Sequence, residues 1–476
     1  MDFPLFHLDF IGNRMLIALT AIIHVVVNHP MAVGAIPLAT LLEWRAWKKG
    51  IAGLDEVAYK ITFVFFVITT SLGALTGVGI WFTTSLVNPA AIGSLLRVFF
   101  WGWFTEWIVF VVEVSLILWY FLSWKKYTGE RKKTHIRLGV VLSLFSWLTM
   151  MIITGILGFM MDPGQWEPYF KLWTPESNML TAFFNPLYWP QLAFRTPFAL
   201  MTAGLFFMFL VPFFTKHNKA LRGQVIRVLS IWTLAFLPLT VAAGLWYWQR
   251  IPGFMVSNAP VAITTQDYTQ WYNTILVLLV AMTILIALIA LLGTIIPRRL
   301  PRLSLFLPFI AAIALLGYFE RVREFVRKPY VIKDYMYANG YRVQDYPLFK
   351  EDGILPHAAF VENKEVTEEN KLAAGHDVFL LACSRCHTMS GINSINKRFS
   401  VLFPNREWQP EQVTAFMENM HNVRPFMPPF PGNQTELEAL ALYIVENQNR
   451  GFRVEGAQSV GMTPRTIKES IEKSSN

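Results

Sequence analysis

The sequence predicts an all-α protein, with a multi-span bundle of about eight transmembrane helices and a small all-α domain after it. Three observations predict this class. The 476 residues are 54% hydrophobic and only 15% charged, and the mean hydropathy of +0.39 is too high for an ordinary soluble protein. Apolar stretches long enough to cross about 30 Å of hydrocarbon recur along the chain. After Tyr330 the composition turns polar, and both cysteines lie there, within "LLACSRCHTM".

Each predicted span contains roughly the 20 residues that a helix needs to cross a bilayer. The spans are residues 14–43, 59–84, 98–122, 138–160, 191–214, 226–248, 272–296 and 303–319. The last is the shortest and is interrupted by Pro308. The first is too long for a cleaved signal peptide and lacks its basic flank, so we expect it to remain as a helix. We expect the preceding "MDFPLFHLDF" to be a short amphipathic segment at the outer surface.

Basic residues gather in alternate loops, and this pattern predicts the orientation of the bundle. The loops after the odd-numbered spans carry Arg45, Lys48, Lys49, Lys60, Lys125, Lys126, Arg131, Lys132, Lys133, Arg137, Lys216, Lys219, Arg222, Arg227, Arg298, Arg299 and Arg302. By the positive-inside rule these loops are cytoplasmic, and both termini are periplasmic. We therefore expect a multi-pass protein of a bacterial cytoplasmic membrane, and the net charge of +9 calls for no nucleic-acid partner. His135 and His217 lie in these basic loops and are predicted to be surface residues.

Composition divides the chain into four parts. Residues 1–330 form the membrane domain, and residues 331–366 are polar and Tyr-rich, as expected for a linker. Residues 367–453 are predicted to form a small folded domain, and residues 454–476 a polar tail.

The C-terminal domain contains a Cys-x-x-Cys-His motif made of Cys383, Cys386 and His387. Two thiols at this spacing can fix the vinyl edges of a haem through thioether bonds, and the adjacent imidazole can then bind the iron. A redox dithiol would not need His387, and a zinc site would need further thiols that this chain lacks. The motif predicts one covalent haem c. Because such haem is attached outside the cytoplasm, the motif agrees with the predicted topology.

Residues 367–453 resemble a class I cytochrome c. "AAGHDVFLLACSRCHT" is similar to the first helix and haem motif of that family, and "LEALALYIVEN" resembles its closing helix. "RPFMPPF" stands where the family places its methionine ligand, so the resemblance implies that Met427 is the distal ligand. We expect Met417 and Met420 to be core residues, and His421 is a rival ligand.

Few ionisable residues lie inside the predicted spans, and each is by default a functional candidate because a buried charge is costly in hydrocarbon. His24 and His29 lie in the first span, Glu106 and Glu113 in the third, and Arg195 at the outer end of the fifth. His24 and Glu106 are each about 15 Å below the outer surface at 1.5 Å per residue, so they can meet at one level. Glu113 lies about 10 Å deeper on the face that carries Glu106.

The residues alone leave two interpretations of these side chains. His24 either binds haem or forms a polar bridge and proton relay between helices. Glu106 and Glu113 either ligate iron or deliver protons. His29, next to a proline, either binds another haem or is satisfied by a carbonyl that the proline frees.

Residues 10–335 resemble subunit I of the cytochrome bd quinol oxidases at four places. These are "IALTAIIHVVV" in the first span, the two glutamates of the third, "THIRLGVVLSLFSWLTMMIITGILGFMMDPG" in and after the fourth, and "EFVRKPY" near the end. The resemblance implies that His24 is the axial ligand of a high-spin haem b, and that one of the two glutamates ligates or protonates there. It also implies that Glu324 and Arg327 support this site through haem propionates. The family's glutamates are eight residues apart, whereas these are seven apart.

Two features of that family are replaced in this chain. On the fifth helix the family has a histidine that ligates the low-spin haem receiving electrons from quinol, nine residues before a glycine. Here Arg195 stands nine residues before Gly204, and a guanidinium cannot ligate iron. Arg195 is expected near haem propionates, in the vacated low-spin pocket, or in a salt bridge to Glu167 or Glu176. Residues 249–271 are too short for the family's quinol-binding loop, and its ninth helix is absent from the sequence.

These features lead to three hypotheses. The chain is a bd-like terminal oxidase in which a soluble periplasmic cytochrome c feeds electrons through the chain's own haem c to haem on His24, where dioxygen is reduced. Alternatively, it is an electron conduit or membrane anchor subunit between a quinone pool and a periplasmic enzyme. An inert scaffold is the third hypothesis, and the polar residues of the spans argue against it. Both redox hypotheses imply a second membrane subunit or additional cytochrome subunits.

Overall fold

The computed structural model describes residues 3–166, 179–404 and 407–459. The chain forms two compact units, which are described separately here. The bundle unit comprises Ala18–Phe82 and Ile92–Arg327, and the C-terminal unit comprises Met1–Ile17, Thr83–Ala91 and Lys328–Asn476. Two short stretches that the sequence places in the membrane domain therefore belong to the C-terminal unit.

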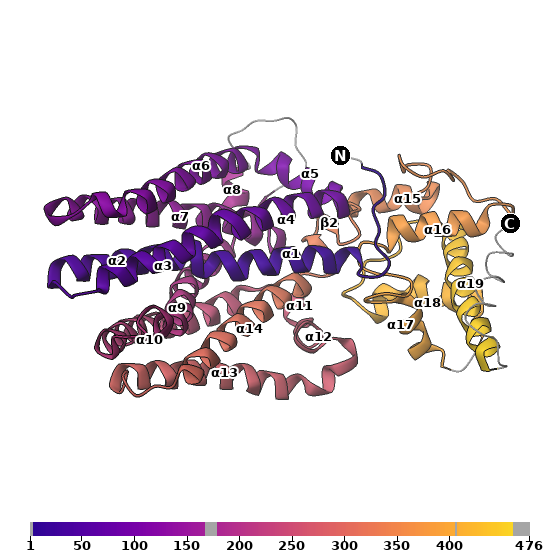
Figure 1. The fold of residues 1–476 in the computed structure, drawn as a ribbon. Helices are drawn as coiled ribbons and strands as arrows, with labels where there is room; N and C mark the ends of the chain where they lie inside the picture. The colour runs from indigo at the N-terminus through magenta and orange to yellow at the C-terminus, as the bar shows by residue number, and fades with distance from the viewer. Residues whose placement is uncertain (1–2, 167–178, 405–406, 460–476) are drawn as a thin grey trace. The chain divides into compact units, whose positions relative to one another are not determined.

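Within the described ranges, eight helices are long and apolar enough to cross a membrane, which confirms the eight predicted spans (Figure 1). They are built from α1 (Asn13–Asn28), α2 (Ala35–Lys49), α3 (Leu54–Ile68), α4 (Ala74–Val87), α6 (Phe100–Ser123), α7 (Lys132–Met161), α9 (Tyr188–Phe214), α10 (Lys219–Arg250), α13 (Tyr272–Ile295) and α14 (Arg302–Val326). Two π-helical segments, η1 (His29–Gly34) and η2 (Thr69–Gly73), join α1 to α2 and α3 to α4. The shorter connecting elements are α5 (Pro89–Val98), α8 (Met179–Phe183), α11 (Gly253–Val256), α12 (Ala259–Thr264), and the 3-10 segments η3 (Trp124–Lys126), η4 (Gly129–Arg131) and η5 (Gln266–Trp271).

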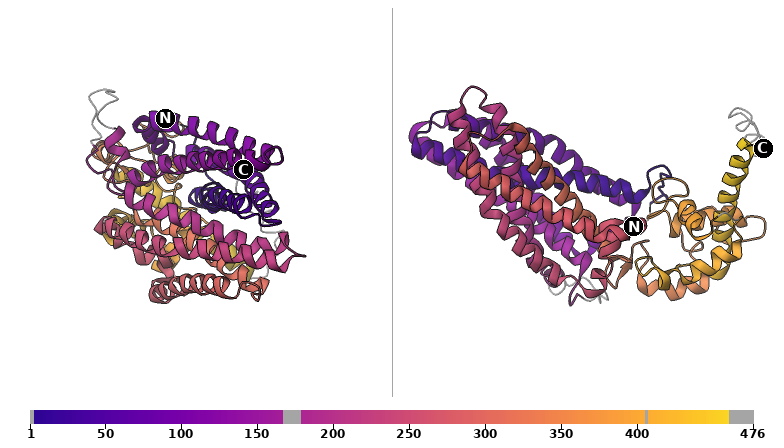
Figure 2. Two further views of the ribbon diagram at one scale, coloured as in Figure 1. Left: turned by 90° about the vertical axis from the view of Figure 1, so that its left-hand side faces the viewer. Right: turned by 90° about the horizontal axis from the view of Figure 1, so that it is seen from below.

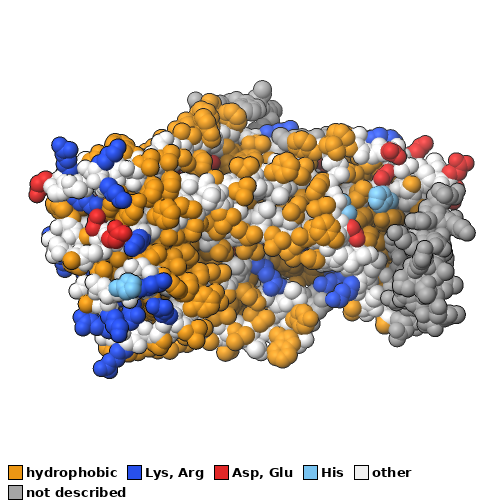
Figure 3. All heavy atoms as spheres, in the orientation of Figure 1, with side chains coloured by type: hydrophobic (Ala, Val, Ile, Leu, Met, Phe, Trp, Pro, Cys, Tyr) orange, Lys and Arg blue, Asp and Glu red, His pale blue; other side chains and the backbone are white. Residues whose placement is uncertain are grey.

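The surface of the bundle unit matches its apolar sequence. The four basic loops lie at one end of the bundle, and Figure 3 shows Lys and Arg side chains gathered there. Apolar side chains cover the helices beyond this end (Figure 3). This distribution is the one expected for a multi-pass membrane protein.

The innermost span is α9, whose apolar stretch is the most buried of the eight. It packs against η1, α10 and α14, and Figure 2 shows the bundle helices side by side from two further directions. At its contact with η1, a Cβ atom added to Gly34 would lie 2.2 Å from the carbonyl oxygen of Ala199. Glycine at this position therefore lets the two backbones touch, a common arrangement between membrane helices.

The last span is longer than predicted. α14 passes through Pro308 and ends at Val326, seven residues beyond the expected end at residue 319. This extension places Glu320 and Arg323 inside the helix, where they contribute to the interior of the bundle.

The C-terminal unit is a small helical domain with one two-stranded antiparallel sheet. Its elements are β1 (Tyr330–Ile332), β2 (Met336–Tyr337), η6 (Val343–Asp345), α15 (Tyr346–Asp352), α16 (Lys371–Ala382), α17 (Ile395–Leu402), α18 (Pro410–Val423) and α19 (Gln434–Ser459). α16 packs against α19. Their backbones meet at Gly375, where an added Cβ would lie 2.1 Å from the carbonyl oxygen of Ala439.

The stretch predicted to be a linker, residues 331–366, is partly folded into this domain. Ile354 and Leu355 are buried in its core. The Glu436 carboxylate on α19 accepts the backbone N–H groups of both residues at 2.8 Å. Sequence composition misses this contribution because two apolar residues are enough to anchor an otherwise polar stretch. Of the predicted tail, residues 460–476 lie outside the described residues.

Candidate functional site

The Cys-x-x-Cys-His motif follows directly on α16 of the C-terminal unit. The backbone N–H groups of Cys386 and His387 donate to the carbonyl of Cys383 at 3.0 and 2.9 Å. This single backbone turn contains both cysteines and the histidine of the motif. Both cysteines are half-buried and free, so no disulfide competes for them.

The ring of His387 is oriented by the loop that follows it. Its Nδ1 lies 3.1 Å from the backbone oxygen of Asn393, so Nδ1 carries the proton and Nε2 keeps the lone pair that binds iron. Asn393 adopts the left-handed conformation with φ of 59°, and its side-chain amide donates to the carbonyl of Cys386 at 2.7 Å. Burial lowers the pKa of His387 to about 4, so the imidazole is neutral at physiological pH. The donor set therefore fits a covalently attached haem c.

Met427 lies in a loop that His421 helps to hold. The Met427 N–H donates to the carbonyl of Arg424 at 2.8 Å, and Nδ1 of His421 lies 2.5 Å from the carbonyl oxygen of Met427. His421 is thus engaged with the Met427 backbone. Met417 is buried in the core, as expected, and Met420 packs against it. Ligation of the iron by Met427 stays a prediction.

In the bundle unit, His24 lies on α1 and its ring faces the start of α4. The Thr76 hydroxyl lies 3.0 Å from Nδ1 of His24. The Asn28 amide nitrogen lies 2.9 Å from Nδ1 and 3.2 Å from Nε2. A bound iron at Nε2 would replace the Asn28 contact there.

Glycines and π-helical segments shape the surroundings of His24. A Cβ atom added to Gly77 would lie 3.2 Å from Cε1 of His24, and one added to Gly73 would lie 2.6 Å from Oδ1 of Asn28. Gly73 ends η2, and η1 begins directly after Asn28. π-Helical turns are rare and are often found at functional sites. His24 therefore lies in a locally irregular part of the bundle with little side-chain bulk around its ring.

Glu106 and Glu113 occupy one face of α6, as the sequence predicts. The buried Glu113 accepts a hydrogen bond from Thr149 on α7 at 2.9 Å, and Ser146, one turn away on the same helix, lies beside it. The side chain of Glu106 is half-buried. Within the described part of the chain, no hydrogen bond joins His24 to either glutamate. The structure thus pairs Glu113 with the Thr149 hydroxyl of α7.

Arg195 on α9 is buried in an ion-paired network. Its guanidinium lies 2.9 Å from Oε1 of Glu320 on α14 and 3.1 Å from Nε2 of His29 on η1. Arg323 binds the other oxygen of Glu320 at 3.0 Å. The expected partner Glu167 or Glu176 lies outside the described residues, and the carboxylate that Arg195 binds is Glu320. The resembling family has an iron-ligating histidine at the position of Arg195. Here that position holds a guanidinium that is paired with the carboxylate of Glu320.

Two further predicted residues, Glu324 and Arg327, form an ion pair with each other at the end of α14. Arg327 is buried, whereas Glu324 is partly exposed. Their role in holding a haem stays a prediction.

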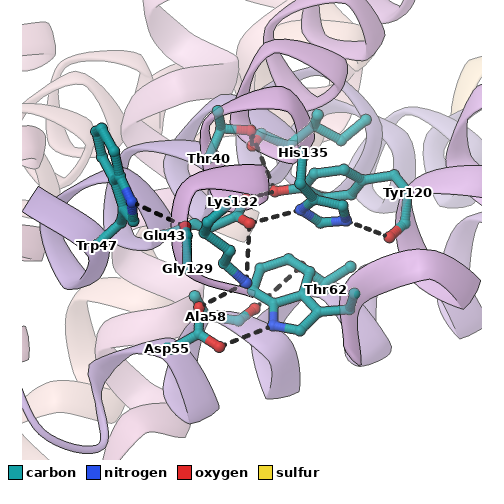
Figure 4. Close-up of polar contacts among 12 residues, drawn as sticks. Thr40, Glu43, Trp47, Asp55, Ala58, Thr62, Tyr120, Gly129, Lys132 and His135 are labelled. Carbon is teal, nitrogen blue, oxygen red and sulfur yellow. Dashed lines mark hydrogen bonds and ion pairs between the residues drawn. The ribbon is translucent and has the colours of Figure 1, made fainter. Parts of the chain in front are cut away.

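A buried polar cluster at the basic end of the bundle was missed by the sequence analysis (Figure 4). Glu43 on α2 is fully buried. Its Oε1 lies 2.5 Å from Nδ1 of His135 and 3.0 Å from Nζ of Lys132, and its Oε2 accepts from the Tyr120 hydroxyl at 2.7 Å. Lys132 also binds Asp55 on α3 at 2.8 Å. The cluster joins α2, α3, α6 and α7.

The prediction that His135 is a surface residue is therefore wrong. Its side chain is 0% exposed and stacks on the ring of Tyr120, with centroids 4.4 Å apart. The basic residues around it in the sequence suggested a solvated loop, but α7 already begins at Lys132. His217, in contrast, is exposed as expected.

A haem-binding motif with an oriented imidazole, together with eight apolar spans, defines a membrane-bound cytochrome. Comparisons with known proteins agree with this class. Residues 370–444 match the family model "Cytochrome C oxidase, cbb3-type, subunit III". None of the curated proteins matches the chain.

Among solved structures, the chain is similar to the bd oxidase from Geobacillus thermodenitrificans. The match covers 69% of this chain and 90% of that one, with a TM-score of 0.57 and 15% sequence identity. At this identity the likeness establishes the fold of the membrane part. The chain thus joins a membrane part with the bd oxidase fold to a C-terminal cytochrome c domain, which supports haem-based electron transfer in a membrane oxidase-like protein.

Proposed function

We propose that this chain is the electron-receiving subunit of a bd-like terminal oxidase that is fed by a periplasmic cytochrome c. Electrons enter at the haem c held by Cys383, Cys386 and His387 and pass to a high-spin haem held by His24. That second haem, when bound, supplies the iron at which dioxygen is reduced to water. The proposal includes a bacterial cytoplasmic membrane, both termini on the periplasmic side, and a second membrane subunit or further cytochromes.

One observation supports a cytochrome, and not quinol, as the electron donor. Arg195 stands on α9 where the resembling family ligates its quinol-oxidised haem, and its charge is satisfied by Glu320 and His29. A side chain bound in this way offers no lone pair to iron. The cytochrome c domain supplies an alternative route for electrons.

The chain's own residues can also relay the protons that the reaction consumes. Glu113 accepts a hydrogen bond from the Thr149 hydroxyl and lies beside Ser146. These two hydroxyl groups continue the proton path from the carboxylate along α7. Glu106 lies one to two turns closer to the predicted outer surface on the same face of α6. We assign the two glutamates to proton delivery, with Glu106 the alternative iron ligand.

Oxygen consumption tests this proposal. The purified protein, in its complex, should consume dioxygen when reduced cytochrome c is the donor, and should show no comparable rate with quinol. The double variant Cys383→Ala/Cys386→Ala, which cannot attach haem c, should lose the cytochrome-dependent rate and keep its membrane haem. Quinol-dependent oxygen consumption that survives this double change would contradict the proposed route.

The second candidate is an electron conduit without oxygen reduction. It is favoured by Arg195, which is paired with Glu320 at the position where the resembling family ligates the low-spin haem that would link haem c to the haem on His24. In that case reduced cytochrome c would be oxidised only in the presence of a further acceptor, and dioxygen uptake would stay at the level of the buffer.

A further inference from the structure

The first residues of the chain have no part in the proposed electron route, yet they belong to the C-terminal unit. We call residues 3–14 the N-terminal segment. Leu5 packs against the core of the cytochrome c domain, and the ring of His7 meets that of Phe379 edge-on, with centroids 5.5 Å apart. Residues 3–8 have no regular secondary structure. The segment is therefore held by tertiary contacts.

Asp9 binds the backbone immediately after the haem motif. One oxygen of its carboxylate accepts the N–H of Met389 at 2.6 Å, and the other lies 3.4 Å from the N–H of Ser390. At Gly391 the two backbones touch, because an added Cβ would lie 1.9 Å from the carbonyl oxygen of Asp9. The N-terminal segment thus holds one side of the loop formed by residues 388–394.

The other side of this loop orients the proximal imidazole. The Asn393 carbonyl accepts from Nδ1 of His387 at 3.1 Å. The loop is closed by the Thr388 hydroxyl, which donates to the Ile392 carbonyl at 3.0 Å, and by the Ile395 N–H, which donates to the Thr388 carbonyl at 2.8 Å. A displacement of the loop at Asp9 would therefore reach the hydrogen bond that holds His387.

We propose that the N-terminal segment is a positioning element of the haem c site, in which Asp9 fixes the loop that orients His387 and thereby lowers the midpoint potential of the haem. This inference rests on the proposed function, because it requires haem c to be bound at His387.

Loss of Asp9 should raise the midpoint potential of haem c. The ferric state carries one more positive charge than the ferrous state, so a nearby carboxylate favours the ferric state. A firm hydrogen bond from the proximal imidazole favours it too, because this bond increases electron density at the iron.

The experiment is a redox titration of the haem c absorption band in the purified full-length protein. Asp9→Asn should shift the midpoint potential upward. Asp9→Ala should shift it further upward because it also removes the hydrogen-bond acceptor. Gly391→Ala changes no charge but forces the two backbones apart, and it should also raise the potential. Glu368→Gln, at a carboxylate that is 94% exposed, is the matched control and should leave the potential unchanged.

Equal potentials in wild type, Asp9→Asn and Gly391→Ala would overturn the inference, as would a downward shift in either variant. Covalent haem on the denatured polypeptide is measured in the same samples. A wild-type protein without covalent haem would overturn the proposed function itself, whereas haem with unmoved potentials overturns only the role of the N-terminal segment. If Asp9→Ala fails to retain haem, the directions given by Asp9→Asn and Gly391→Ala still decide.

Discussion

At the scale of single residues, the histidines of this chain differ in what their second ring nitrogen does. His387 donates to the Asn393 carbonyl and so keeps Nε2 for iron, whereas the ring of His24 contacts the neutral side chains of Thr76 and Asn28. His29 is directed at Arg195, and His135 uses both nitrogens within protein contacts. The environment of the ring, and not its depth in the membrane, separates candidate ligands from histidines that pack the interior.

Glu320 pairs with two cations in the bundle, since one carboxylate serves both Arg195 and Arg323. Its replacement by Ala removes the only carboxylate described as binding Arg195, which should lower the free energy of unfolding by about 3–5 kcal/mol. Thermal unfolding followed by circular dichroism in detergent would measure this change.

The exposed pair Lys60 and Glu56 provides the control for Glu320→Ala. Glu56→Ala removes a solvated ion pair, so it should change stability by no more than about 1 kcal/mol. Equal effects of the two substitutions would mean that the Arg195 network does not stabilise the bundle.

At the scale of elements, the bundle is held by close contacts at small residues and by polar clusters between helices. Gly34 brings η1 onto α9, and Glu43 joins α2 to α6 and α7. Neither contact can be read from hydropathy, which gives the length of a span but not the face that it turns to its neighbours.

Gly34→Ala tests the first of these contacts. The added methyl group would lie 2.2 Å from the Ala199 carbonyl, so η1 and α9 must separate, with a loss of about 1–3 kcal/mol in stability. Because His29 lies on η1, the change should also weaken its contact with Arg195.

Gly317→Ala on α14 is the matched control, because nothing lies within 4 Å of an added Cβ there. In an open helical position, alanine should raise stability by up to about 1 kcal/mol. A lower melting temperature for Gly317→Ala than for Gly34→Ala would contradict the packing described for η1.

At the scale of the whole molecule, the sequence was enough to predict eight spans and a haem c motif, because both are local signals. The sequence was not enough to predict contacts between residues that lie far apart along the chain. Glu320 was missed because hydropathy ended the last span at residue 319, and Asp9 because its partners lie about 380 residues away. The cluster of Glu43 and His135 was missed because the basic residues near His135 in the sequence indicated a solvent-exposed loop. A single sequence gives the composition and the hydrophobic periodicity of each helix, but not which helix faces pack together.

The central claim is that His24 holds a haem at which an external ligand can bind. A carbon monoxide difference spectrum of the reduced protein tests it most directly, with wild type compared to His24→Ala and to the surface control His217→Ala. We expect a carbon monoxide-reactive high-spin signal in wild type and His217→Ala, and its loss in His24→Ala with the haem c band intact. A wild-type spectrum with only low-spin signals, or a reactive haem that persists in His24→Ala, would contradict the account.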